Sequence, residues 1–84
     1  DIDGLDPALC PATGTPVPGG LSFAQACFLL RALVQSGRCL TGFDLVEVAP
    51  GPHGDEWDGN VGARLLYKLI GHALASRAGQ TGTP

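Results

Sequence analysis

Positive charge is scarce in this sequence. Five Lys and Arg residues stand against eight Asp and Glu in 84 residues, and the formal net charge is −3. The basic residues are scattered singly, whereas nucleic-acid binding needs a basic patch, so we expect no nucleic-acid partner. Long apolar runs are also missing. No stretch approaches the roughly twenty apolar residues of a membrane span, so we expect no membrane partner.

Cysteine is scarce and irregularly spaced. Cys10, Cys27 and Cys39 form an odd set without a CxxC pair or a Cys/His spacing. This pattern argues against a disulfide scaffold and a zinc site, and favours a reducing compartment. We therefore expect a cytoplasmic protein, with mitochondria as the alternative. Cys27 lies among apolar helix positions and is expected to be a small buried hydrophobe. No Ser/His/Asp, Cys/His or phosphate-cradling glycine pattern is present.

Two amphipathic helices are predicted, separated by one strand. Ser22 and Gln25 form a capping-box pattern, and Gly37 is a typical stop for the helix that follows. The second helix is expected to begin at Asn60, a common N-cap residue. Apolar residues recur at helical spacing in both helices. They are Phe23, Ala26, Cys27, Leu30, Leu33 and Val34 in the first, and Val61, Leu65, Leu66, Leu69, Ile70, Ala73 and Leu74 in the second.

The predicted strand covers residues 43–49 and ends at Pro50. A β-forming run between two helices indicates a parallel strand covered on both faces, so the fold class is α/β. Asp1 to Asp3 reads as the end of another strand. Since one full strand cannot form a stable sheet, we expect residues 1–78 to be a fragment of a larger domain. Residues 79–84 are expected to be a disordered tail.

Asp1 and Asp3 are candidate metal ligands. In an extended strand, residues i and i+2 point to the same side, where two carboxylates repel each other. A hard divalent cation would offset that repulsion. Solvated acidic residues are the alternative. An EF-hand does not fit, because Leu5 and Asp6 stand where that loop needs an oxygen ligand and a glycine.

The residues after Asp3 form a long loop rich in proline and glycine, and loops of this length are usually functional. The string Asp1-x-Asp3, Pro7, Pro11-Ala12 and Gly20 resembles the signature of the arginase/agmatinase family, the ureohydrolases. Asp-Gly-Leu-Asp-Pro and Pro-Ala-Thr-Gly-Thr-Pro match that family nearly word for word. A second block, residues 44–50, resembles the strand of the family that ends in Glu-Val. Residues 56–67 look closer to agmatinase-type members than to arginase proper. The loop before them departs from the patterns of both groups.

This resemblance implies the C-terminal part of a three-layer α/β/α domain with a parallel sheet. Family members hydrolyse a guanidino group, as in agmatine, to urea and an amine. A hydroxide that bridges two Mn²⁺ ions attacks the guanidinium carbon. By resemblance Asp1 and Asp3 bind metal, Glu47 accepts hydrogen bonds from the substrate guanidinium, and Thr15 lies beside the substrate. The intact protein is expected to be a homo-oligomer, a trimer or hexamer.

Alternatives stay open for two of the site residues and for the chain as a whole. Thr15 is also an ordinary turn residue, and Glu47 an ordinary solvated strand-end residue. His53 and His72 match no family motif, because the catalytic and metal-binding histidines of the family lie upstream of the matching segment. The chain itself is therefore either part of an active hydrolase, a catalytically incompetent fragment, or a non-catalytic module that lacks the upstream ligands and the general acid/base.

Overall fold

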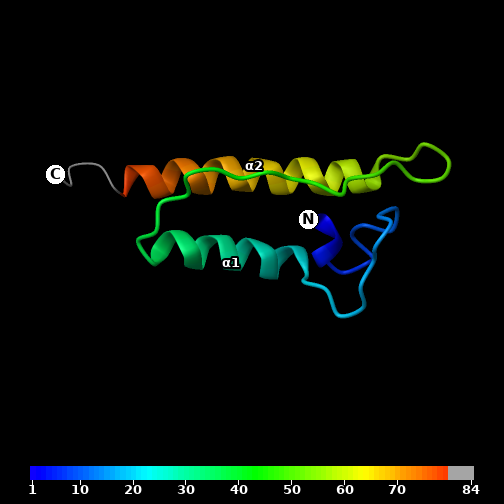
Figure 1. Ribbon diagram of the computed structural model, residues 1–84, viewed down its shortest axis with the longest axis horizontal. Coiled ribbons are helices and arrows are strands. Elements are labelled where there is room, and N and C mark those ends of the chain that lie inside the picture. Colours follow the sequence, from blue (N-terminus) through cyan, green and yellow to red (C-terminus); the bar gives the residue numbers. More distant parts are fainter. Residues whose placement is uncertain (80–84) are drawn as a thin grey trace.

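The computed structural model describes residues 1–79. A short 3-10 helix, η1 (Ile2–Gly4), is followed by two α-helices, α1 (Phe23–Gln35) and α2 (Trp57–Ala78). The α-helices contact each other and run in the same direction, with the N-terminal loop beside their first turns (Figure 1). No helix among the described residues is long and apolar enough to cross a membrane. Of the expected tail, only Gly79 is described, and it caps α2; the rest of the tail lies outside the described residues.

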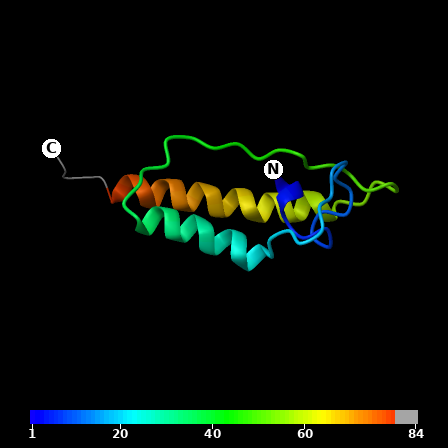
Figure 2. The ribbon, with the colours of Figure 1, turned by 60° about the horizontal axis from the view of Figure 1, so that its bottom comes forward.

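An extended segment, residues 38–50, connects the end of α1 to the loop before α2. Figure 2 shows it beside α2, on a different side from α1. The backbone N–H of Leu40 donates to Ser76 Oγ (2.9 Å) at one end. At the other end a Cβ on Gly62 would lie only 3.0 Å from Val48 Cγ2 and 3.3 Å from Leu45 Cδ2, so glycine permits this close approach. The chain thus runs along α1, returns in the opposite direction as an extended segment, and runs along α2 (Figures 1 and 2).

The strands predicted at residues 1–3 and 43–49 are not formed. Residues 1–79 contain only an isolated parallel bridge between Leu5 and Leu21, and Asp1 precedes a 3-10 helix instead of ending a strand. Val46 O accepts a hydrogen bond from Ile2 N (3.2 Å), but no ladder follows from it. A strand needs a neighbouring strand for its backbone groups, and the described residues supply residues 43–49 with no such neighbour beyond this one bond.

The helix starts were predicted with mixed success. The capping box of α1 is confirmed: Ser22 Oγ accepts from Gln25 N (3.0 Å), and Gln25 Oε1 accepts from Ser22 N (2.9 Å). Gly37 follows α1 at a φ of 89°, as expected of a stop glycine. The start of α2 was placed too late. Glu56 is its N-cap, and Asn60 lies inside the helix, where its Oδ1 accepts from Arg64 Nε (2.9 Å).

The core is small and lies under the N-terminal loop. Its buried members are Ile2, Leu5, Cys10 and Val61. Cys10 is therefore the fully buried cysteine, whereas Cys27, expected to be buried, is only half-buried, in a helix without any buried residue. The radius of gyration is 14.5 Å, against about 12 Å for a compact domain of this length. Large apolar side chains, such as Phe28 (66% exposed) and Leu74 (60% exposed), remain in solvent.

Candidate metal and substrate site

Asp1 and Asp3 flank a completely buried residue of the N-terminal segment, Ile2. Ile2 lies in the core, and its N–H donates to Val46 O (3.2 Å). Asp1 is exposed and Asp3 is half-buried. Because η1 has about three residues per turn, the alternation of an extended strand does not describe these two carboxylates. Their place at the surface follows instead from the anchored isoleucine between them.

Thr15 lies against Asp3. Its Oγ1 donates a hydrogen bond to Asp3 Oδ2 at 2.5 Å, although the two residues are far apart in sequence. The structure therefore brings together two of the four predicted site residues, in a pairing that the sequence did not indicate. Thr15 itself is exposed, in the Pro/Gly loop between η1 and α1.

Asp58 anchors that loop, and the sequence reasoning missed it. The Ala12 N–H donates to its carboxylate, 3.2 Å from Oδ2 and 3.4 Å from Oδ1. Asp58 is only 1% exposed and lies in the first turn of α2, where the helix dipole favours a negative charge. An acidic residue in the first turn of a helix was the signal available. Its partner, a backbone N–H of a remote loop, was not visible in the sequence.

Removing the Asp58 carboxylate should loosen the loop. In Asp58→Ala the Ala12 N–H loses its acceptor, which should cost about 1–3 kcal/mol of unfolding free energy. Asp58→Asn keeps one acceptor oxygen and should cost less. The control is Glu56→Ala, an exposed neighbour whose side chain caps nothing. Thermal unfolding followed by circular dichroism tests this, and equal midpoints for Asp58→Ala and Glu56→Ala would contradict it.

Cys10 is a buried residue of the same loop, and its surroundings favour the neutral thiol. Its Sγ is 3.7 Å from Asp6 O and 3.9 Å from Leu5 O. Burial, and then the negative charges of Asp58, Asp3 and Asp6, raise the pKa of the thiol. A neutral thiol is neither a good nucleophile nor a good metal ligand, so Cys10 serves the packing of the loop.

Glu47 is exposed and has an unusual backbone. Its φ of 70° makes it a non-glycine residue in the left-handed region. Such conformations cost of order 1–3 kcal/mol and are concentrated at functional sites. Its neighbour Val46 is bonded to Ile2, so the backbone of Glu47 lies at the same end of the molecule as Asp1 and Asp3. No direct contact joins the Glu47 side chain to Asp3 or Thr15 among the interactions of the described residues.

The donor set for a metal is partial. Asp1 and Asp3 offer the hard oxygen ligands that Mn²⁺ accepts. Within residues 1–79, however, no group of three or more His, Cys, Asp or Glu side chains is placed to hold a metal ion. The ring of His72 is engaged with its own helix, with Nδ1 2.7 Å from Lys68 O. The two aspartates thus fit as part of a metal site and do not complete one.

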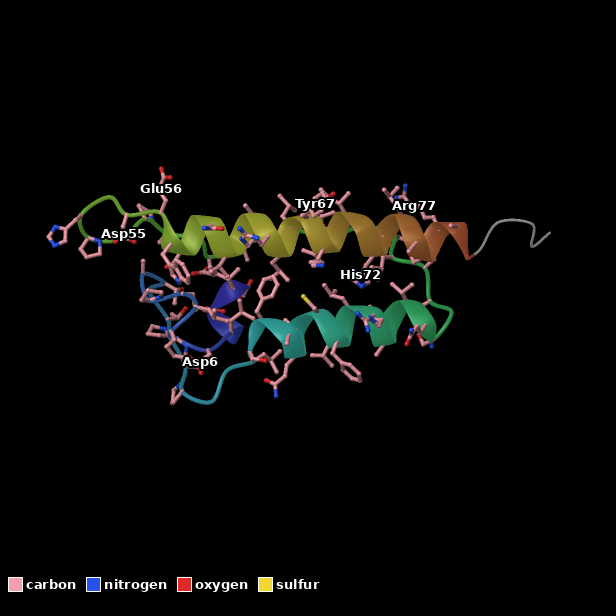
Figure 3. All side chains as sticks on the ribbon, turned by 180° about the vertical axis from the view of Figure 1, so that it is seen from behind. Asp6, Asp55, Glu56, Tyr67, His72 and Arg77 are labelled. Carbon is pink, nitrogen blue, oxygen red and sulfur yellow. The ribbon has the colours of Figure 1, made fainter. Side chains whose placement is uncertain are left out.

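A hollow of about 720 Å³ opens where the extended segment meets the start of α2. Val48, Pro50, Asp55, Glu56 and Trp57 contribute to its lining. Figure 3 shows Asp55 and Glu56 at this end of α2, with Asp6 on the far side of the N-terminal loop. None of the four predicted site residues lines the hollow, so its volume does not define the substrate site.

Comparison with known proteins points to one family. The model of the arginase family matches residues 1–72. Guanidinobutyrase of Pseudomonas aeruginosa is 48% identical over 73 residues, covering 83% of this chain and 21% of that protein. N(1)-aminopropylagmatine ureohydrolase of Thermus thermophilus is 42% identical over 71 residues, covering 84% of this chain and 23% of that protein. Mitochondrial arginase-2 of Mus musculus is 42% identical over 81 residues, covering 96% and 22%.

These matches cover the site residues but little of the relatives. Asp1, Asp3, Thr15 and Glu47 all lie inside the segment that the family model matches. The chain spans only about a fifth of the length of the curated relatives it matches, between 21% and 23% for the three above.

Proposed function

The chain belongs to the arginase family, and from this premise we propose that its 84 residues are the C-terminal part of a ureohydrolase. The full-length protein, meaning the product that carries these residues with the rest of the domain, hydrolyses a guanidino compound to urea and an amine. The observation that carries the proposal is the family match over residues 1–72, which includes every predicted site residue. The relatives are named for different guanidino substrates, and agmatine or a related linear compound is our choice among them.

In this proposal Asp1 and Asp3 are ligands of a site for two Mn²⁺ ions, and the other ligands lie outside the 84 residues. The ions would activate water and neutralise charge. The chain's own contribution is placement: buried Ile2 fixes both aspartates, and its bond to Val46 ties them to the segment that carries Glu47. Glu47 binds the guanidinium through two parallel charge-assisted hydrogen bonds and so orients the carbon that is attacked.

We also propose that residues 43–49 become a parallel strand in the full-length protein. The segment is already extended between two helices that run in parallel (Figure 1). Its Phe43, Val46 and Val48 are exposed, which is costly unless another element covers them. Neighbouring strands would supply the missing backbone partners and complete the three-layer α/β/α domain. A cytoplasmic homo-oligomer, trimer or hexamer, is the assembly that we propose for it.

Urea release by the full-length protein tests the function. We expect the Mn²⁺-loaded protein to release urea from at least one of agmatine, 4-guanidinobutyrate, N1-aminopropylagmatine and arginine, and agmatine-type substrates to be best. Release from none of them would overturn the proposal, and a preference for arginine would overturn the agmatinase-like assignment.

The 84-residue chain by itself should be inactive. Residues 1–79 contain no group of three ligands that could hold a metal ion, which favours inactivity of the isolated chain. Two carboxylates without further ligands should bind Mn²⁺ only weakly, on the order of millimolar, as sparse carboxylate sites do. Calorimetric titration of the isolated chain with Mn²⁺ measures this directly, and tight stoichiometric uptake would contradict it.

A further inference from the structure

Thr15 makes the closest polar contact at the candidate metal ligands. Its Oγ1 lies 2.5 Å from Asp3 Oδ2, within the short range of hydroxyl-to-carboxylate hydrogen bonds. We propose that Thr15 is a positioning residue, whose hydroxyl holds one carboxylate oxygen of Asp3 and so aims the other at the metal. This inference rests on the proposed function for the metal, and it gives Thr15 a role different from the expected contact with the substrate, which stays the alternative that the experiment tests.

The number of hydrogen bonds that the Thr15 hydroxyl can donate favours this role. A threonine hydroxyl carries a single proton, and here Oγ1 directs it to Asp3. A guanidinium is a donor-only cation, so it could use just the remaining lone pairs of the hydroxyl. The one proton of the Thr15 hydroxyl is therefore committed to the Asp3 carboxylate, and a substrate could meet only its lone pairs. Outer hydrogen bonds of this kind fix the orientation of metal ligands.

The backbone around Thr15 is held in place before any metal binds. Three residues earlier, the Ala12 N–H is bonded to buried Asp58. Thr13 is itself 94% buried, since only 6% of its surface is exposed. On the other side Pro16 restricts Thr15 to an extended conformation. Because Thr15 is also β-branched, its hydroxyl has few rotamers to lose. The bond to Asp3 thus costs little conformational entropy even though Thr15 is exposed.

The chain offers a matched control in the same loop. The Thr13 hydroxyl is buried and has no hydrogen-bond partner. Thr13→Val and Thr15→Val remove the same atom types two residues apart, but only the second removes a bond to Asp3. Thr15→Ser keeps the hydroxyl and should restore it.

The experiment is a Mn²⁺ titration of the metal-free full-length protein and its variants by calorimetry, with bound metal counted by atomic absorption. Thr15→Val should weaken Mn²⁺ affinity by about 10- to 100-fold, the usual effect of losing an outer-shell partner. Thr15→Ser and Thr13→Val should stay close to wild type. At saturating Mn²⁺, the KM of Thr15→Val for the guanidino substrate should be unchanged.

Each contrary result is informative. Unchanged Mn²⁺ affinity with a raised KM in Thr15→Val would overturn the inference in favour of substrate contact. Unchanged affinity and unchanged KM would make Thr15 a turn residue and overturn it as well. Wild type that binds no Mn²⁺ would overturn the inference together with the metal site. Wild type that binds Mn²⁺ with the expected dependence on Thr15, yet releases no urea, would support the inference and overturn only the proposed reaction.

Discussion

Asp3→Ala is expected to abolish urea release by the full-length protein and to lower its bound Mn²⁺. The substitution removes both carboxylate oxygens and leaves the Thr15 hydroxyl without its acceptor. Since Asp3 is a proposed direct ligand, its loss should exceed the roughly 10- to 100-fold effect of losing an outer-shell partner. Metal analysis after gel filtration and a urea assay in excess Mn²⁺ measure the two effects separately.

His72→Ala is the control for that experiment. His72 is half-buried on α2, and its Nδ1 lies 2.7 Å from Lys68 O in the same helix. Its removal should leave metal content and activity nearly unchanged. Asp3→Ala protein that still carries full Mn²⁺ and activity would show that Asp3 is no ligand. An equal loss in both variants would point to a general effect on folding.

The sequence predicted well what is determined locally. The capping box of Ser22 and Gln25 uses two residues of one turn, and both of its hydrogen bonds are formed. Gly37 likewise needs only its own backbone freedom to end α1. The family was also correctly identified, because short strings around Asp1 and Thr15 are distinctive without any knowledge of packing.

The errors all concern partners that are remote in sequence. Residues 43–49 have strand-like composition, yet a strand forms only where a neighbouring backbone is present. Cys27 has an apolar helical pattern around it, but α1 contains no buried residue, whereas Cys10 is enclosed by the loop. Asn60 is a good cap in isolation. In the structure, α2 begins earlier, and its first turn places Asp58 against Ala12.

At the candidate site, too, the residue types were predicted from the sequence, but the contacts between remote residues were not. The residue types at Asp1 and Asp3 indicated metal chemistry, but their geometry was inferred from a strand that the structure replaces with η1. The bond between Thr15 and Asp3 depends on how the whole Pro/Gly loop folds back, which no local pattern encodes. The positive φ of Glu47 was equally hidden, since glutamate is not a residue that favours it.

The backbone of Glu47 makes the substitution Glu47→Gln informative. Glutamine has the same shape and meets the same steric cost at a φ of 70°, so the substitution changes charge while leaving the backbone strain as it is. Glu47 is not a proposed ligand, so the fold and the bound Mn²⁺ of the full-length protein should survive. Any change in turnover then reports on the carboxylate itself.

Glu47→Gln should lower kcat/KM for the best guanidino substrate by about thirty-fold to several thousand-fold. The proposed charge pairing of Glu47 with the guanidinium would be lost, and the new NH₂ group would face a donor, which should cost roughly 2–5 kcal/mol once substrate covers the site. The control is Asp44→Asn, which replaces an exposed residue of the same extended segment and should lower kcat/KM much less. Urea release across the substrate panel, with bound metal measured in parallel, tests this. Equal activity of wild type and Glu47→Gln would rule out the guanidinium role, whereas matched losses of activity and metal would make Glu47 a residue that maintains the structure.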